Sequence, residues 1–252
     1  MNSWKSILQS SLKDNIEKVG PSATYAAMAT VRRDNTPAVR TVVTRGFAGE
    51  NHAENFGWHS DLLVVITDKR SDKIKEIQAN PNTEINWYMN GTMEQFRIRG
   101  KVNIVEKNYV ETKLEHLNSH FDQVETAGKY DQKSLGLQMF LKQQESGTTN
   151  TFNWQAERLR HFYQFGANMR KDMTIEKKQA LQIDSIDEHG WFKSEQVQDL
   201  LEEAFENFVL LVIDVTSVRH WSPTTGTKLH SILLETTTSY DDVFNTLATT
   251  CL

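Results

Sequence analysis

The first hundred residues alternate apolar and polar positions with the two-residue period of β-strands, and short turns separate the runs. Strands are expected over residues 25–33, 38–47, 62–67, 84–89 and 95–105. Asn90-Gly91 is the strongest turn signal, because a type I′ hairpin needs positive φ at both central positions. Short connections of this kind join antiparallel neighbours.

Two helices are expected among these strands. Residues 3–19 place Trp4, Leu8 and Leu12 near helical spacing, and Gly20-Pro21 ends the segment. We expect this amphipathic helix to lie on the sheet. Residues 72–79 form the second helix, which Ser71 can cap. Residues 48–60 are polar and contain glycine, which predicts a surface loop.

After residue 105 the pattern becomes helical. Helices are expected over residues 107–124, 130–145, 174–183 and 194–207, with an aromatic-rich segment at 152–166. This stretch has no linker composition and no repeat, so we interpret 107–207 as a helical elaboration of one domain spanning 1–252. The last strands are expected at 208–215 and 229–234, followed by a weakly structured or helical tail at 237–252.

The order of elements favours a mainly β fold with added helices (α+β), built on a small antiparallel barrel. A doubly wound sheet is disfavoured, because the chain has neither G-x-G-x-x-G nor a Walker-type loop.

Composition excludes several classes of protein. With 252 residues, 38% of them hydrophobic, the chain can bury a core. A net charge of −5 argues against general nucleic-acid binding, which depends on neutralising phosphates. No apolar run approaches a membrane span and no leader is seen, so no membrane partner is expected. The only cysteine, Cys251, allows no internal disulfide, and a cytoplasmic location is expected, with entry into the nucleus left open.

One stretch combines a strand, a basic turn and a helix start. The first amides of the helix are unpaired, and Arg70, Ser71 and Lys73 add donors around them. This arrangement indicates an anion site, although from the turn alone a solvated basic turn is the commoner outcome. Arg40 and Arg45 project from opposite faces of the strand at 38–47. That strand is either an edge strand with arginines in solvent or a strand crossed by a ligand.

Four ordered motifs closely resemble the pyridoxamine 5′-phosphate oxidase-like FMN-binding split-barrel family. They are RTVVTRGF (40–47), TDKRSDK (67–73), NPNTEINWYM (80–89) and EQFRIRGKV (94–102). The resemblance covers about residues 4–105 and resumes near 208–232. It implies a six-stranded antiparallel split β-barrel that forms a two-fold homodimer, with one FMN in each of two clefts at the subunit interface.

The resemblance also implies site residues. Arg40 matches the arginine that reaches the FMN phosphate, and Ser71 and Lys73 match a phosphate-binding pair. Gln95 matches a glutamine at the isoalloxazine ring, and Trp221 matches a flavin-contacting tryptophan. The other implied cofactor contacts are Thr41, Val42, Val43, Thr44, Ile66, Thr67 and Arg70. The implied substrate-side residues are Arg45, Lys228 and His230. No metal site is expected.

The chain departs from the family pattern at several positions. Asp72 replaces a basic residue at the phosphate site, and Ile232 replaces a final flavin-side arginine. Arg45 replaces a lysine that meets the substrate phosphate. In ungapped register, the remaining substrate-phosphate residues fall on Lys113, Leu117 and Phe121.

Three functions are consistent with this pattern. The first is an FMN-dependent oxidase of pyridoxamine or pyridoxine 5′-phosphate, in which the flavin accepts a hydride from C4′ and passes the electrons to O2. The second is a non-catalytic split-barrel dimer with weak or no flavin binding, acting as a binding or regulatory protein. The third is a flavin enzyme with another electron donor or acceptor. Whether the chain is an enzyme is left open, and a small phosphorylated ligand is expected.

Overall fold

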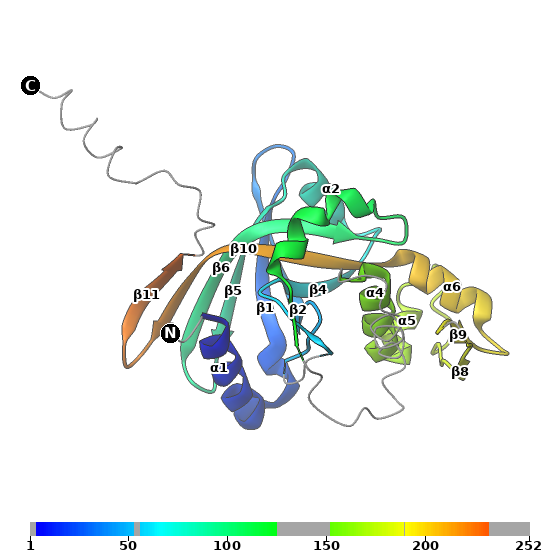
Figure 1. Cartoon of the computed structure of the whole chain (residues 1–252), viewed down its shortest axis with the longest axis horizontal. Helices are drawn as coiled ribbons and strands as arrows, with labels where there is room; N and C mark the ends of the chain where they lie inside the picture. Colours follow the sequence, from blue (N-terminus) through cyan, green and yellow to red (C-terminus); the bar gives the residue numbers. More distant parts are fainter. Residues whose placement is uncertain (1–3, 53–55, 125–151, 189, 232–252) are drawn as a thin grey trace, which may run out of the picture.

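The computed structural model describes residues 4–52, 56–124, 152–188 and 190–231. Seven antiparallel strands form the main sheet, in the order β11-β10-β4-β2-β1-β5-β6. Six of them close into a barrel, because β10 pairs with β6 as well as with β4, and β11 extends the sheet beyond β10 (Figure 1). The strands are β1 (Tyr25–Val31), β2 (Pro37–Phe47), β4 (Leu63–Asp68), β5 (Asn82–Met89), β6 (Glu94–Val105), β10 (Phe208–Ser222) and β11 (Gly226–Ser231). The expected six-stranded antiparallel barrel with added helices is confirmed.

The strands β4 and β10 are buried on both faces. Val209 and Leu211 of β10 face the barrel core, whereas Leu210 and Val212 face a second core outside the barrel. This double burial explains why β10 reads as a continuous apolar run, with no alternation. β10 is longer than the segment expected at 208–215, because its second half also pairs with β6 and β11.

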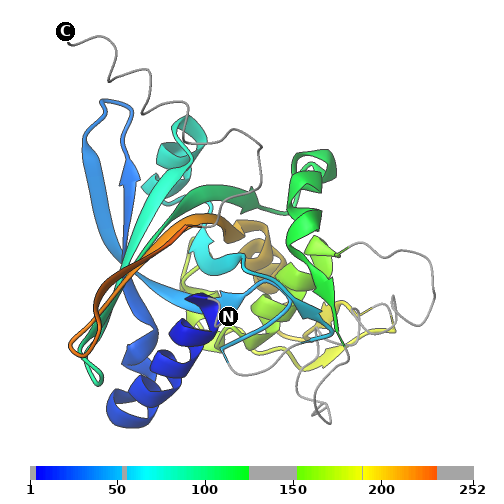
Figure 2. The same cartoon turned by 60° about the vertical axis from the view of Figure 1, so that its left-hand side comes forward.

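Helix α1 (Trp4–Val19) packs against the barrel (Figures 1 and 2). Its Trp4, Leu8 and Leu12 enter the barrel core. Asn15 of the same helix accepts a hydrogen bond of 2.6 Å from the backbone N–H of Gly91. The predicted helix and its buried face are therefore confirmed.

The hairpin between β5 and β6 is confirmed, but its predicted type I′ turn is wrong. Four residues, 90–93, connect the strands, and Met93 rather than Gly91 has positive φ, at 56°. Glycine is needed at position 91 for another reason. A Cβ there would lie 2.9 Å from Asn15 Oδ1, so Gly91 permits the close approach of α1.

The segment predicted as a surface loop, 48–60, is largely buried in its described part. Ala48, Phe56 and Trp58 belong to the buried residues, and Trp58 lies in the short strand β3 (Trp58–His59). Glu50 is 3% exposed and accepts hydrogen bonds from Lys5 and from the Ser60 N–H. The polar composition misled the prediction, because these polar groups are satisfied inside the protein.

In its described part, the block between β6 and β10 is less helical than expected. Residues 107–124 form two 3₁₀ turns, η2 (Glu111–Lys113) and η3 (Glu115–His120), and the short strand β7 (Asp122–Gln123). Residues 174–183 contain no helix. The helices are α4 (Trp154–Gln164), α5 (Ala167–Lys171) and α6 (Gln198–Asn207), and a small hairpin joins β8 (Ser185–Ile186) and β9 (Phe192–Lys193). The predicted helix 130–145 and the tail 237–252 lie outside the described residues.

None of the helices in the described ranges combines the length and the apolar character that a membrane span requires. Helix α2 (Asp72–Ala79) matches its prediction.

The block attaches to the barrel through buried charges as well as through aromatic packing. Glu157 of α4 is fully buried and lies 2.7 Å from Arg160 Nη2. It also accepts a hydrogen bond of 3.1 Å from the N–H of Gly49, and Arg160 donates to the backbone carbonyl of Glu50. Burial opposes ionisation of Glu157, but Arg160 and His161 outweigh it and hold its pKa at about 2.

Candidate functional site

The end of β4 and the start of α2 bring together the residues expected to bind a phosphate. Lys73 Nζ donates to Thr67 Oγ1 at 2.9 Å, and Thr67 Oγ1 lies 3.1 Å from Ser71 Oγ. Ser71 occupies the N-cap position of α2, but its side chain makes no capping bond to the helix. The first amides of α2 and two hydroxyls are therefore available beside an ammonium group.

Arg40 lies close enough to this group to influence its charge. Burial lowers the pKa of Lys73, and the positive charge of Arg40 lowers it further. Two cations that repel one another across a half-buried site form an arrangement that an anion stabilises. The donor set, two cations with two hydroxyls and a helix start, fits a phosphate group.

Acidic partners orient the arginines of this region. Arg40 donates to Glu76 Oε2 at 2.6 Å and also to the hydroxyl of Thr30. Burial opposes ionisation of Glu76, but hydrogen bonds from Thr30 and Arg40 outweigh it and keep the pKa of this carboxyl low. Arg70 is held by Asp68 through bonds of 2.9 Å and 3.1 Å from its Nε, so the structure ties it to this carboxylate. Asp72, whose charge opposes an anion, is exposed.

The rest of the predicted cofactor stretch on β2 alternates between two environments. Val42 and Thr44 point inward, where Val42 joins the barrel core and Thr44 Oγ1 donates to the Thr24 carbonyl. Thr41 and Val43 lie on the outward face. Ile66 on β4 is partly buried and packs against the second core.

Arg45, also on the outward face of β2, differs from Arg40 in having no hydrogen-bond or ion-pair partner among the described residues. Its Nε is buried without a hydrogen bond, and its guanidinium lies 5.6 Å from the centre of the Phe165 ring. Burial lowers the pKa of Arg45. An unpaired buried donor is unusual in a folded protein and marks a position where a ligand can bind.

The other predicted residues form a separate group on β6, β10 and β11. Gln95 and Trp221 are direct cross-strand partners, and Gln95 Nε2 donates to Asn86 Oδ1 at 2.9 Å. Lys228 is exposed on β11, and the backbone of His230 pairs opposite Val218. Within the described ranges, no hydrogen bond or ion pair joins this group to Arg40 or Lys73.

The positions reached by ungapped extension of the family pattern are not assembled with the site. Leu117 is fully buried in the second core, Phe121 stacks on Phe152 at 3.9 Å, and Lys113 is exposed.

The sequence interpretation missed Thr30 and Glu76, which orient Arg40, and Phe165, which faces Arg45. Glu76 is one helical turn after Lys73, a spacing that places both on the same side of α2 and gave a usable signal. No local signal exists for Phe165, because it contacts Arg45 only through the tertiary fold.

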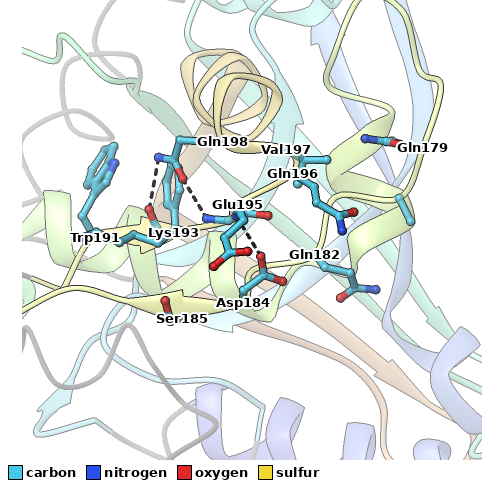
Figure 3. A pocket seen from close by; sticks show the side chains of 13 residues that line it. Gln179, Gln182, Asp184, Ser185, Trp191, Lys193, Glu195, Gln196, Val197 and Gln198 are labelled. Atoms are coloured by element: carbon cyan, nitrogen blue, oxygen red, sulfur yellow. Dashed lines mark hydrogen bonds between the residues drawn. The ribbon is translucent and has the colours of Figure 1, made fainter.

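One cavity in the described part of the chain lies away from this group of residues. It measures about 890 Å³ and is lined by polar side chains around β8, β9 and the start of α6 (Figure 3). Gln179, Gln182 and Gln196 around it are exposed to solvent. None of the predicted site residues lines this cavity. The candidate site is therefore assigned from its hydrogen-bond donors and not from a cavity.

Comparisons with known proteins give the same family as the motifs. Residues 1–106 match the model of the family described as pyridoxamine 5'-phosphate oxidase, FMN-binding domain. A protein of Arabidopsis thaliana, pyridoxine/pyridoxamine 5'-phosphate oxidase 2, is 37% identical over 113 residues, which are 44% of this chain and 52% of that protein. The chain thus spans about half the length of this relative.

A solved structure has the same fold. The pyridoxamine 5'-phosphate oxidase-related, FMN-binding protein of Nostoc punctiforme aligns with a TM-score of 0.53 and 20% identity, covering 92% of this chain and 98% of that one. Residues 1–106 therefore match the FMN-binding domain family that the motifs resemble, and the Nostoc structure shows the same fold.

Proposed function

Residues 1–106 belong to the FMN-binding domain family of the pyridoxamine 5'-phosphate oxidases, and from this premise we propose that the protein oxidises a phosphorylated B6 vitamer with O2. Pyridoxine 5′-phosphate and O2 would give pyridoxal 5′-phosphate and hydrogen peroxide. Pyridoxamine 5′-phosphate would consume one water in addition and release ammonia. FMN, when bound, supplies the two-electron redox chemistry, which no side chain of the chain provides.

The group formed by Arg40, Thr67, Ser71 and Lys73 carries this proposal. Lys73 and Ser71 would donate to the FMN phosphate, together with the first amides of α2. Glu76 holds Arg40 through a bond of 2.6 Å, so this guanidinium is oriented before any ligand arrives. The lowered pKa of Lys73 supports the assignment, since a bound phosphate would relieve the repulsion between the two cations.

The separation of the predicted residues into two groups supports a homodimer. The outward face of the sheet carries exposed aromatic rings, with Tyr25 at 52%, Tyr88 at 47% and Trp221 at 40% of their surface accessible. A second copy of the chain would cover this apolar face. It would also bring Gln95 and Trp221 of one protomer to the phosphate-binding group of the other.

On the substrate side, Lys228, His230 and Arg45 are proposed to orient the vitamer. Arg45 would meet the substrate phosphate, because its Nε has no partner within the protein. The solitary cysteine, Cys251, fits a reducing compartment, and we place the protein in the cytoplasm.

Flavin retention tests this proposal directly. The protein is loaded with FMN and desalted, and the flavin absorbance is then titrated to obtain the dissociation constant. Arg40→Ala and Lys73→Ala should each weaken FMN binding by about 10-fold to 100-fold, the value of a hydrogen bond to a charged group. Lys75→Ala is the matched control, because Lys75 is an exposed residue of the same helix. Unchanged FMN binding in Arg40→Ala and Lys73→Ala would reject the assigned phosphate site.

A second function is favoured by one set of contacts. Asp68 binds Arg70 and Glu76 binds Arg40, which reduces the positive charge available to FMN. Such a site suits a non-catalytic dimer that binds flavin or another phosphorylated ligand weakly. Turnover of pyridoxine 5′-phosphate with peroxide release decides between the two functions.

A further inference from the structure

Arg45 of β2 lies against the helical block between β6 and β10, where it faces Phe165. Within the described ranges, Arg45 forms no ion pair and no hydrogen bond, and its Nε is buried. A guanidinium has five N–H donors, and leaving buried donors unpaired is costly unless a ligand supplies the acceptor.

The block places an aromatic ring against this guanidinium. Phe165 follows the last residue of α4, and its ring centre lies 5.6 Å from Arg45 Cζ. Phe165 is itself held firmly: its ring packs on Phe208 at 5.7 Å, and Arg170 donates to its backbone carbonyl. The ring is only 6% exposed, so it cannot easily rotate away from Arg45.

Within the described residues no carboxylate pairs with Arg45, and of the nearby titratable groups only Tyr25 favours its positive charge. For both His52 and His161, burial is the main cause of a lowered pKa, and the positive charge of Arg45 lowers the pKa further. Both imidazoles are therefore neutral at neutral pH. The nearby carboxylate of Glu157 is already bound by Arg160 and by the Gly49 N–H.

We propose that the helical block forms one wall of the substrate site, with Phe165 as a positioning residue that holds Arg45 ready for a phosphate monoester. The proposal rests on the proposed function, since it deepens the role of the same cleft. The ring stabilises the planar guanidinium by a cation–π contact and leaves its N–H donors free for an anion. The guanidinium is then already oriented for a phosphate, so Arg45 loses little side-chain entropy on binding.

The test measures ligand binding by calorimetry on the full chain, with or without flavin. The probe is pyridoxine 5′-phosphate, and unphosphorylated pyridoxine serves as the reference ligand. Phe165→Leu should weaken binding of the phosphorylated probe by about threefold to tenfold, the range expected for a cation–π contact, and leave pyridoxine unaffected. Phe165→Tyr should restore the affinity, because it keeps the ring. Arg45→Lys should behave like Phe165→Leu, because an ammonium lacks the planar fork.

Phe192→Leu is the matched control. Phe192 is fully buried in the same core, and its ring contacts are with other aromatic residues of the block. This variant should lower the melting temperature without changing the affinity for pyridoxine 5′-phosphate. Equal losses in Phe165→Leu and Phe192→Leu, or no loss in Phe165→Leu, would overturn the proposal. A change in dimer dissociation with unchanged binding of the phosphorylated probe would also overturn it.

Failure of the proposed function gives a different result. A wild-type protein that retains no FMN and turns over no vitamer rejects that function. The calorimetric comparison of Phe165→Leu with Phe192→Leu then still decides whether Phe165 positions Arg45 for a phosphate.

Discussion

The barrel and the helical block have buried cores of similar extent but different composition. The barrel core consists chiefly of aliphatic residues on alternating strand positions, such as Leu63, Val65 and Ile85. The block is built around aromatic rings, and its α4 also buries the charged residues Glu157 and Arg160. The two cores share β4 and β10, which present one face to each.

The two regions are therefore stabilised by different kinds of interaction. Aliphatic burial is non-directional and tolerates change, whereas a buried ion pair is stable only while every partner is present. We therefore expect the block to lose much of its stability when one buried charge is removed. The barrel should be destabilised most by substitutions at the positions where two strand backbones approach closely.

Removing the central carboxylate of the block should have the largest effect. Glu157→Ala leaves Arg160 and His161 buried without their acceptor, and the free energy of unfolding should fall by about 3–5 kcal/mol. Hydrogen exchange should rise in α4 before it rises in β1 and β5. Glu195→Ala, an exposed carboxylate of the same block, is the control. Uniform exchange over both regions in Glu157→Ala would break the comparison.

Lowering the pH should destabilise the same buried contact of Glu157 with Arg160 and His161. The pKa of His161 is about 4, lowered mainly by burial, so the unfolded chain binds its proton first as the pH falls below 6.5. The pKa of Glu157 is about 2, against 4.5 when unfolded, so further stability is lost from pH 4.5 downward. Each group contributes at most about 1.4 kcal/mol per pH unit within its window.

Urea unfolding of the wild type and of His161→Asn between pH 7 and pH 3 measures this effect. The variant should lose less stability between pH 6.5 and pH 4, because its side chain does not titrate. Identical pH profiles for the two proteins would show that His161 plays no part in acid sensitivity.

The barrel should be most sensitive at Gly100. A Cβ at this position would lie 2.3 Å from the backbone oxygen of Asp214, where β6 pairs with β10. Gly100→Ala should therefore cost about 1–3 kcal/mol by overpacking, measured by thermal denaturation. Gly166→Ala in the block is the matched control, since nothing lies within 4 Å of its Cβ. Equal melting temperatures for the two variants would contradict the assignment.

A surface ion pair within the helical block should matter least. Lys107 Nζ lies 2.7 Å from Glu206 Oε2, and both side chains are more than a third exposed. Lys107→Ala should change the free energy of unfolding by no more than about 1 kcal/mol, and by less in high salt. Melting curves at low and high ionic strength measure it. A larger loss would mean that this pair, and not the buried network, anchors the block.

Much of the barrel and part of the candidate site were predictable from the sequence. The strands β1, β2, β5 and β6 follow from alternation, β4 follows from its short run of branched apolar residues, and α2 follows from its periodicity and its flanking turns. The residues Thr67, Ser71 and Lys73 of the motif TDKRSDK lie together in the structure, because they are neighbours along the chain.

Other features had no local signal. Residues 107–124 have helical periodicity but form 3₁₀ turns, because Leu114 and Leu117 pack into the block's core in that form. Residues 48–60 look polar, but their described part is largely buried, because Glu50 forms hydrogen bonds with Lys5 and Ser60. Propensity is a weak prior that such tertiary contacts override.

The sequence by itself therefore determined the strands, the hairpin and the basic turn at the start of α2. Only the tertiary structure determined which basic side chains have a carboxylate partner. Arg40 and Arg70 received carboxylate partners, whereas Arg45 received only the ring of Phe165. The physical reason is that strand and turn formation depend on neighbouring residues, while the charge state and availability of a side chain depend on whatever the fold packs against it.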